Sequence, residues 1–146
     1  MKELFGRMVF NIFIDNTDDH EKNHVLLMDD AGHLDLAPAF DVVCTGQSMH
    51  FQQMRVGRAG ADSTIANALS EAGSFGLSES AARPEIARIA KICDGWRRHF
   101  KAAGVYAADI EYWAQHLDSE FLRGQRRDAQ TRVTVVQRSR GQRAAR

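Results

Sequence analysis

The sequence contains few cysteines and prolines and no long apolar run. Its two cysteines, Cys44 and Cys93, follow no CxxC or other metal-binding spacing, so neither a zinc site nor a disulfide framework is indicated. We expect both to be free thiols in a reducing cytoplasm. No apolar stretch approaches the roughly 20 residues of a membrane-spanning helix, and the N-terminus lacks the basic-then-apolar pattern of a secretory signal.

The composition is that of a globular domain with an uneven distribution of charge. The 146 residues are 44% hydrophobic and 26% charged, which is typical of a chain that buries one core. Residues 1–122 carry 11 Lys and Arg against 18 Asp and Glu, a net charge of −7. Residues 123–146 carry eight Arg and a single acid, a net charge of +7.

This asymmetry predicts a boundary near residue 123. We interpret residues 1–122 as the folded domain and residues 123–146 as an Arg-rich tail that is disordered or docks weakly on the acidic domain, because the only apolar cluster of the tail is Val133, Val135 and Val136. A nucleic-acid-binding arm is the alternative for the tail, since spaced arginines neutralise phosphates. No aromatic residues are interleaved to support it.

Hydrophobic periodicity predicts a mostly helical chain. Apolar residues recur at helical spacing in four segments, 3–14, 64–72, 81–102 and 109–124. Pro84 is expected in the first turn of the third helix or at a kink in it, and Asp109 at the N-cap of the fourth. We expect Gly124 to end the last helix, and the segment 46–63 to be irregular.

Two short apolar segments, 24–28 and 33–36, flank the turn 29–32 and predict a β-hairpin. Pro38 follows the second segment, where proline cannot donate to a strand ladder. Together with the helices, this hairpin predicts an α+β fold that is mostly α-helical.

Oxygen-bearing side chains flank this hairpin. Asp18 is followed five residues later by Asn23, and Asp41 lies just beyond the hairpin. Phosphoryl transfer needs a carboxylate to orient and deprotonate the attacking hydroxyl, and oxygen ligands to hold Mg²⁺ on the phosphates of a nucleotide. A helix, an acidic loop, a hairpin and a second acid in this order therefore indicate a phosphotransferase site. Asp19 and Glu21 are expected to face solvent.

The same region resembles the core motif of the HipA-like toxin serine/threonine kinases. Its patterns N-x-D-x-H-x-K-N and L-x-P-x-[FY]-D occur in VFNIFIDNTDDHEKNHVLL and LDLAPAFDVV. The matching residues are Asn16, Asp18, His20, Lys22, Asn23, Leu36, Pro38, Phe40 and Asp41. A weaker resemblance continues to about residue 122. The resemblance as a whole implies the C-terminal lobe of a protein-kinase-like fold.

The resemblance also implies a role for each polar residue of the motif. Asp18 would be the catalytic base, and Asn23 and Asp41 would bind Mg²⁺ and, through it, ATP. His20 and Lys22 complete the implied catalytic set. His20 fits a loop-fixing residue better than a proton shuttle, and Lys22 either steadies the transferred phosphate or is simply solvated.

The implied function is a serine/threonine protein kinase that is the toxin of a type II toxin–antitoxin system. Its implied partners are a HipB-like helix-turn-helix antitoxin and a protein substrate, such as a translation factor or an aminoacyl-tRNA synthetase. No Gly-rich, phosphate-covering loop precedes Asp18. We therefore expect the small N-terminal lobe to be absent and the isolated chain to have little kinase activity.

Two other interpretations are open. A catalytically inactive fragment would bind an antitoxin, a separate N-terminal lobe or another copy of itself. A metal-dependent phosphohydrolase would use Asp18, Asp19 and His20 and would hydrolyse a simple phosphoester without ATP.

Overall fold

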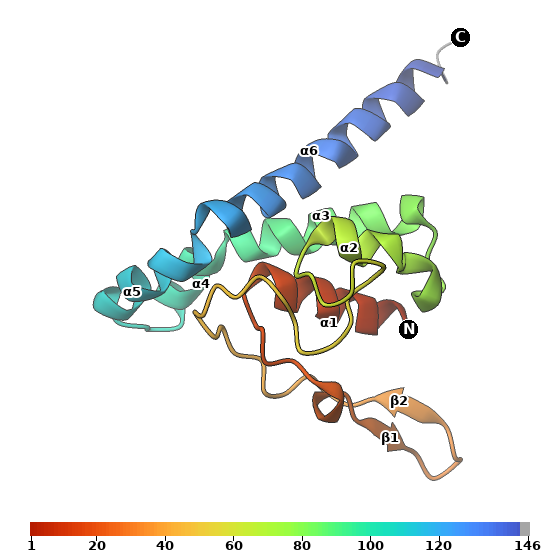
Figure 1. Ribbon diagram of the computed structural model, residues 1–146, viewed down its shortest axis with the longest axis horizontal. Coiled ribbons are helices and arrows are strands. Elements are labelled where there is room, and N and C mark those ends of the chain that lie inside the picture. Colours follow the sequence, from red (N-terminus) through yellow and green to blue (C-terminus); the bar gives the residue numbers. More distant parts are fainter. Residues whose placement is uncertain (144–146) are drawn as a thin grey trace.

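The computed structural model describes the backbone of residues 1–143 and the side chains of residues 1–131. Within this range the chain forms six α-helices and one antiparallel hairpin (Figure 1). The helices are α1 (Lys2–Phe13), α2 (Ile65–Ser70), α3 (Glu79–Asp94), α4 (Trp96–Ala102), α5 (Ala107–Leu117) and α6 (Glu120–Arg143), with 3₁₀ turns η1 (Glu21–Asn23) and η2 (Ala72–Phe75). The predicted mostly helical α+β class is confirmed.

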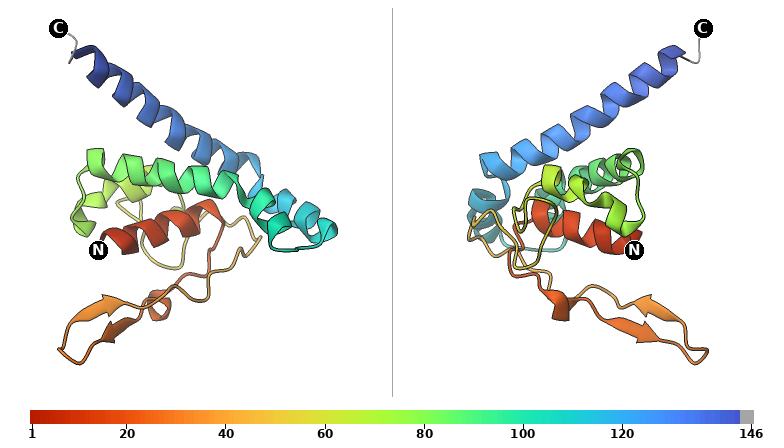
Figure 2. Two further views of the ribbon diagram at one scale, coloured as in Figure 1. Left: turned by 180° about the vertical axis from the view of Figure 1, so that it is seen from behind. Right: turned by 45° about the vertical axis from the view of Figure 1, so that its right-hand side comes forward.

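Helix α3 is the central element of the helical layer. It packs against α1 on one side and against the first part of α6 on the other (Figures 1 and 2). Helix α1 forms as predicted, because Phe5, Val9 and Ile12 recur at helical spacing and are fully buried. No helix in the described part of the chain has the length and apolar character needed to cross a membrane.

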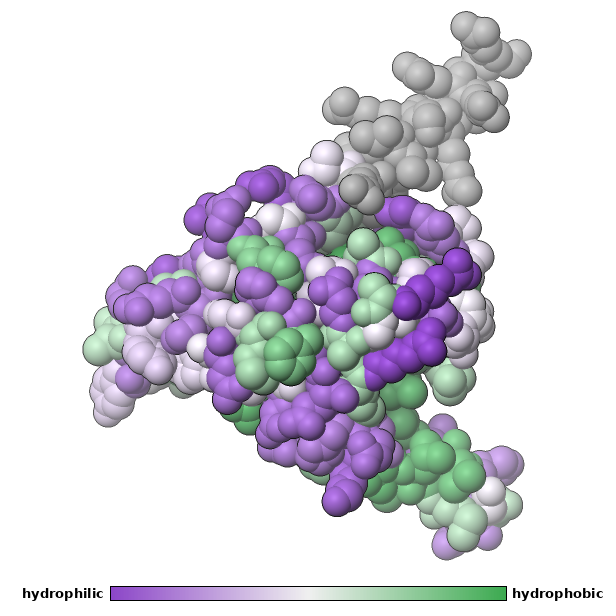
Figure 3. Space-filling view, in the orientation of Figure 1, coloured by the Kyte–Doolittle hydropathy of each residue, from purple (hydrophilic) through white to green (hydrophobic). Residues whose placement is uncertain are grey.

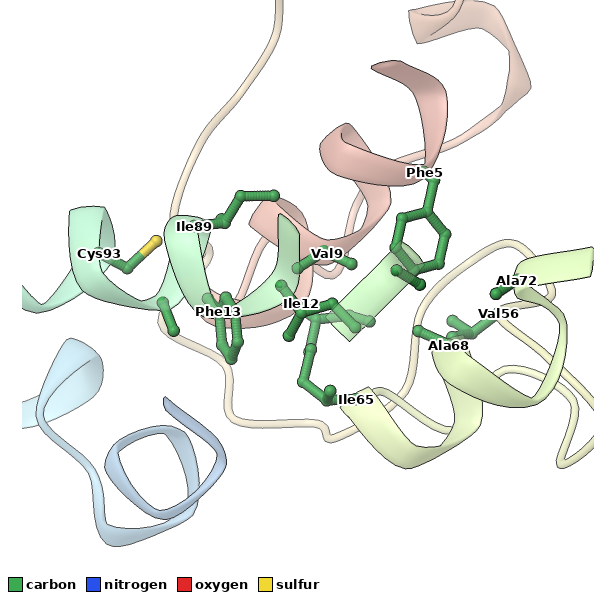
Figure 4. Close-up of a cluster of buried hydrophobic side chains, with 13 residues drawn as sticks. Phe5, Val9, Ile12, Phe13, Val56, Ile65, Ala68, Ala72, Ile89 and Cys93 are labelled. Atoms are coloured by element: carbon green, nitrogen blue, oxygen red, sulfur yellow. The ribbon is translucent and has the colours of Figure 1, made fainter. Parts of the chain in front are cut away.

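The main core lies between α1, α2 and α3 (Figure 4). Phe13 from α1 is fully buried in it, and Ile65 and Ala68 from α2 and Ile89 from α3 also contribute. Each large side chain buried in this way stabilises the fold by about 1.5–3 kcal/mol. The core therefore fixes the C-terminal end of α1, from which the polar loop departs.

The prediction of one helix over 81–102 is wrong, because the chain divides into α3 and α4 at Gly95. The Gly95 N–H donates to the carbonyl of Ile92 at 3.0 Å, which is a tighter turn than an α-helical one. Helix α3 also begins earlier than expected, because the Ser78 hydroxyl accepts the N–H of Ala81 at 3.2 Å as an N-cap. Pro84 therefore lies inside α3 rather than in its first turn.

The predicted helix over 109–124 is also wrong. Helix α5 begins after Tyr106, so Asp109 lies in its first turn. It ends at Leu117, and residues 118 and 119 separate it from α6. Helix α6 then passes through Gly124 without ending. Helical backbone thus extends into the segment predicted to be disordered. The side chains of residues 132–146, including the three valines of the tail, lie outside the described residues, so an Arg-rich tail that binds nucleic acid stays a prediction.

The predicted hairpin is confirmed as β1 (Leu26–Met28) and β2 (Leu34–Leu36), with Leu27 opposite Asp35. Its turn is held by Asp29, whose Oδ1 accepts the N–H groups of Ala31 and His33 at 2.9 and 2.8 Å. The hairpin projects away from the helices, and apolar surface gathers over it (Figures 1 and 3). Leu27 itself is 54% exposed.

Candidate functional site

The loop after α1 is tied to the segment that follows the hairpin. Asp15 adopts a left-handed conformation with φ +56°, which turns the chain sharply out of α1. Its carbonyl accepts the N–H of Thr45 at 3.1 Å, and its carboxylate accepts the N–H of Ser48 at 3.0 Å. The hydroxyls of Thr17 and Thr45 lie 2.8 Å apart. These contacts hold the loop beside the segment that begins at Asp41.

Asp18 is exposed and follows this anchored turn. Its Oδ1 accepts a hydrogen bond from Nε2 of Gln53 at 2.7 Å. No arginine, lysine or histidine of the described side chains forms an ion pair with Asp18, so none of them neutralises its carboxylate. Sequence reasoning did not identify Gln53, because its contact with Asp18 spans 35 positions.

Asn23 lies in η1 and is 7% exposed. Its Nδ2 is buried and has no hydrogen-bond partner among the described residues. A buried amide without a partner costs about 1–3 kcal/mol, and such groups require a specific explanation. Because rotation of the amide exchanges its two ends, Asn23 can also present its oxygen at this position.

The expectation that Asp19 faces solvent is wrong. Asp19 is 6% exposed, and its carboxylate lies 3.1 Å from Nε2 of His24. This Asp19–His24 pair closes the loop, and its members directly follow Asp18 and Asn23 in the sequence. In the sequence, the pair is indicated by an acid and a histidine that stand five positions apart across a polar turn.

Asp41 is exposed and has φ +54°, a left-handed conformation that costs about 1–2 kcal/mol for a residue with a Cβ. Its carboxylate makes no hydrogen bond or ion pair to the described residues. Backbone strain of this kind concentrates at functional sites. The conformation and the unpaired carboxylate are both compatible with a ligand-binding role.

The structure brings together some of the predicted residues but not all. A cavity of about 390 Å³ is lined by Asn23, by the Asp19–His24 pair and by Phe40, the residue before Asp41. Neither Asp18 nor Asp41 lines this cavity. His20 is half-buried, and its Nδ1 lacks a partner in the described part of the chain, whereas Lys22 is exposed.

Hard oxygen donors are present for a magnesium ion. Within the described residues, no three His, Cys, Asp or Glu side chains are grouped to hold a metal ion by themselves. Magnesium, however, is commonly bound by one or two protein groups, with waters and nucleotide phosphates as the other ligands. The amide of Asn23 and the carboxylate of Asp41 fit such a donor set.

The comparisons with known proteins bear on the same residues. A family model described as "HipA-like C-terminal domain" matches residues 1–96. The searches of curated proteins and of solved structures found no match. The matched region is about two thirds of the chain, and it contains the loop with Asp18 and Asn23, the hairpin and Asp41. On this match, the chain belongs to the family of HipA-like C-terminal domains.

Proposed function

We propose that this chain provides the metal-binding and catalytic-base part of a HipA-type serine/threonine protein kinase, which transfers phosphate from ATP to a protein serine. One observation carries the proposal. The Asp19–His24 pair, with Asp19 buried and His24 half-buried, holds a loop that has an exposed carboxylate, Asp18, at one end and a buried amide without a partner among the described residues, Asn23, at the other.

Asp18 is the base in this proposal. Gln53 donates to Oδ1 of Asp18 at 2.7 Å, which orients the carboxylate and leaves Oδ2 for the hydroxyl of the substrate serine. Magnesium-bound ATP, held by Asn23 and Asp41, would supply the phosphoryl group and neutralise part of its charge. Removal of the hydroxyl proton by Asp18 then makes the serine oxygen a better nucleophile.

His20 and Lys22 support this loop in different ways. The Asn23 N–H donates to the carbonyl of His20 at 3.0 Å, so the backbone of His20 begins the turn that carries Asn23. The loop-fixing role proposed for the His20 side chain rests on the family resemblance, because this contact is made by the backbone and the buried Nδ1 has no partner among the described residues. Lys22 is exposed and makes no ion pair with a described acid, which leaves its ammonium group free to contact a phosphate.

The wider biological role follows from the family in this proposal. The chain would act in the cytoplasm within a toxin–antitoxin system, with a helix-turn-helix antitoxin as its partner and a translation-related protein as its substrate. The exposed hairpin favours a second candidate, an inactive domain that binds an antitoxin or a separate N-terminal lobe. Leu26, Leu27 and Met28 are 55%, 54% and 72% exposed, and apolar surface of this kind promotes association.

The test is calorimetry of a non-hydrolysable ATP analogue with and without Mg²⁺. We expect magnesium-dependent binding that is weakened roughly tenfold or more by Asp41→Asn, which removes the negative charge of one proposed metal ligand, and by Asn23→Ala, which removes the other ligand. Asp35→Asn, which changes an exposed acid on the hairpin, is the matched control and should bind as the wild type does. Binding that ignores both Mg²⁺ and Asp41→Asn contradicts the proposal.

Phosphate transfer to an added protein substrate separates the two candidates. In the kinase candidate, Asp18→Asn abolishes transfer but retains nucleotide binding, because Asp18 acts on the hydroxyl and not on the metal. Because the isolated chain is expected to transfer little phosphate, magnesium and nucleotide binding without transfer supports the inactive, partner-binding domain when transfer is also absent with a separate N-terminal lobe added.

A further inference from the structure

A second and larger cavity adjoins the one that Asn23 lines, since Phe10, Val42, Arg88 and Ile92 line both, but Asn23 itself does not reach it. Its volume is about 910 Å³, and it is bounded by the end of α1, the junction of α3 and α4, and the segment 42–44. In the left view of Figure 2, α4 continues beyond α3 after the break at Gly95, next to the end of α1. The main apolar residues that line it are Phe10, Phe13, Ile14, Trp96, Phe100 and Leu117.

The charged residues of this cavity all have the same sign. They are Arg88, Lys91, Arg98 and Arg126, and no Asp or Glu lines it. This is unexpected on a domain whose residues 1–122 carry a net charge of −7. A basic rim on an acidic domain selects for anions, because the rest of the surface repels them.

Two of these cations are available to a ligand. Arg126 donates to Asp94 at 2.7 Å and Arg88 to Glu85 at 2.6 Å, so both are already paired. Lys91 and Arg98 are exposed, and neither forms a hydrogen bond or ion pair with the described residues. The free positive charge of the cavity is thus concentrated on α3 and α4.

The size and depth of the cavity fit a small molecule. Phe13 and Leu117 at its base are 0% and 5% exposed, so the cavity reaches the core and is not a flat surface. Sites for small ligands are typically concavities of roughly 300–1,000 Å³ that are mostly apolar and have a few polar groups. This cavity has both properties.

We propose that this cavity binds a small amphipathic carboxylate, an unbranched acyl chain that ends in an anionic group. The acyl chain lies along Trp96 and Phe100, where its methylene groups leave water. The carboxylate pairs with Lys91 and Arg98 at the rim. The proposal does not depend on phosphate transfer, since none of Asp18, Asn23 and Asp41 lines the cavity.

The test compares three probes of equal chain length, dodecanoate, dodecanol and dodecyltrimethylammonium, each below its micelle concentration or solubility limit. Binding is measured by calorimetry and by tryptophan fluorescence, to which Trp96 in the cavity contributes together with Trp113 outside it. We expect saturable binding of one dodecanoate, with the neutral and cationic probes weaker by about tenfold or more. Equal binding of the three probes, or no saturable binding of dodecanoate, overturns the proposal.

Variants locate the site on the rim. The double variant Lys91→Gln, Arg98→Gln should bind dodecanoate about tenfold more weakly and should bind dodecanol with unchanged affinity, because it removes only the positive charges of the rim. Lys2→Gln, Lys101→Gln is the matched control, since both lysines are exposed and outside the cavity. Thermal melts of all variants confirm that they fold. Unchanged dodecanoate affinity in the folded rim variant contradicts the proposal.

Discussion

Arg126 donates through Nε to Oδ1 of Asp94 at 2.7 Å and fastens α6 to the end of α3. The side chain of Arg126 is 2% exposed and that of Asp94 is 46% exposed, so the pair reaches from the core to the surface. The remaining nitrogens of Arg126 donate to the carbonyls of Phe13 and Leu117 at 3.3 and 2.8 Å. One arginine thus connects α6 with the ends of three other helices.

Arg126→Met should lower the free energy of unfolding by about 3 kcal/mol. The variant keeps much of the apolar volume but leaves two buried carbonyls without their donors and removes an ion pair of which only the arginine is buried. Denaturation by urea measures the change. Arg127→Met is the matched control, because Arg127 is 66% exposed and lies 3.7 Å from Glu120, so its effect should stay below about 0.5 kcal/mol. Equal losses in the two variants would show that Arg126 acts only as a surface charge.

The elements that local patterns specify were predicted from the sequence. Helix α1 and the hairpin have clear periodicity and turn residues, and both form where expected. The break at Gly95 is closed by a local hydrogen bond to Ile92 that periodicity does not reveal, and α6 continues through Gly124 to Arg126, which long-range contacts hold. Composition placed Arg126 in a tail that is disordered or weakly docked, but Arg126 is buried by contacts with Asp94 and with two carbonyls that lie 9 to 113 positions away.

In the candidate site, too, some features were predicted from the sequence and others were missed. The order of Asp18, Asn23 and Asp41 around a hairpin is a local pattern, and their proposed roles were inferred from it. The contact of Gln53 with Asp18 was not, since it crosses 35 positions. The burial of Asp19 was also missed, because an acid in a polar loop usually faces solvent unless a partner such as His24 is recognised.

The two thiols should react slowly with iodoacetamide in the native protein. Burial raises the pKa of Cys44 to about 11 and that of Cys93 to about 12. Only the thiolate is nucleophilic, so the native rates should still rise about tenfold per pH unit at pH 9–10. Mass spectrometry of each cysteine follows the reaction, with the protein in urea as the control, whose rates level off near pH 9. Native rates that also level off there contradict the raised pKa values.

The same shifts predict the direction of a change in stability with pH. A thiol with a raised pKa keeps its proton in the folded state, whereas the unfolded chain releases it near pH 9. The free energy of unfolding therefore has its full value, as far as these thiols are concerned, below pH 9, and it falls as the pH rises towards 11. Cys44→Ala, Cys93→Ala should remove this part of the alkaline loss, even though the variant is less stable overall because its core loses volume. Urea denaturation at pH 8 and pH 10 measures how much unfolding free energy the variant and the wild type each lose over this interval. Equal losses in the two proteins would rule out the thiols as the cause.

Gly57 lies where the irregular segment before α2 touches that helix. A Cβ at this position would be 2.0 Å from the carbonyl oxygen of Asn67 and 2.7 Å from the hydroxyl of Ser70. Asn67 also binds the segment directly, since its Oδ1 accepts the N–H of Ala59 at 2.8 Å and its Nδ2 donates to the carbonyl of Gly60 at 3.1 Å. Any side chain at Gly57 must therefore push the segment away from α2.

Gly57→Ala should cost about 3 kcal/mol of unfolding free energy, the upper part of the range for an overpacked site. Gly73→Ala is the control, because nothing lies within 4 Å of its added Cβ, and its stability should be unchanged or raised by up to about 1 kcal/mol. The damage should also extend to the loop after α1, since Gln53 belongs to the displaced segment and would no longer orient Asp18. Hydrogen exchange of the N–H groups of residues 56–63 measures the displacement. Wild-type protection in Gly57→Ala would show that the segment keeps its contacts with Asn67. It would contradict the prediction that a change at Gly57 disturbs the contact of Gln53 with Asp18.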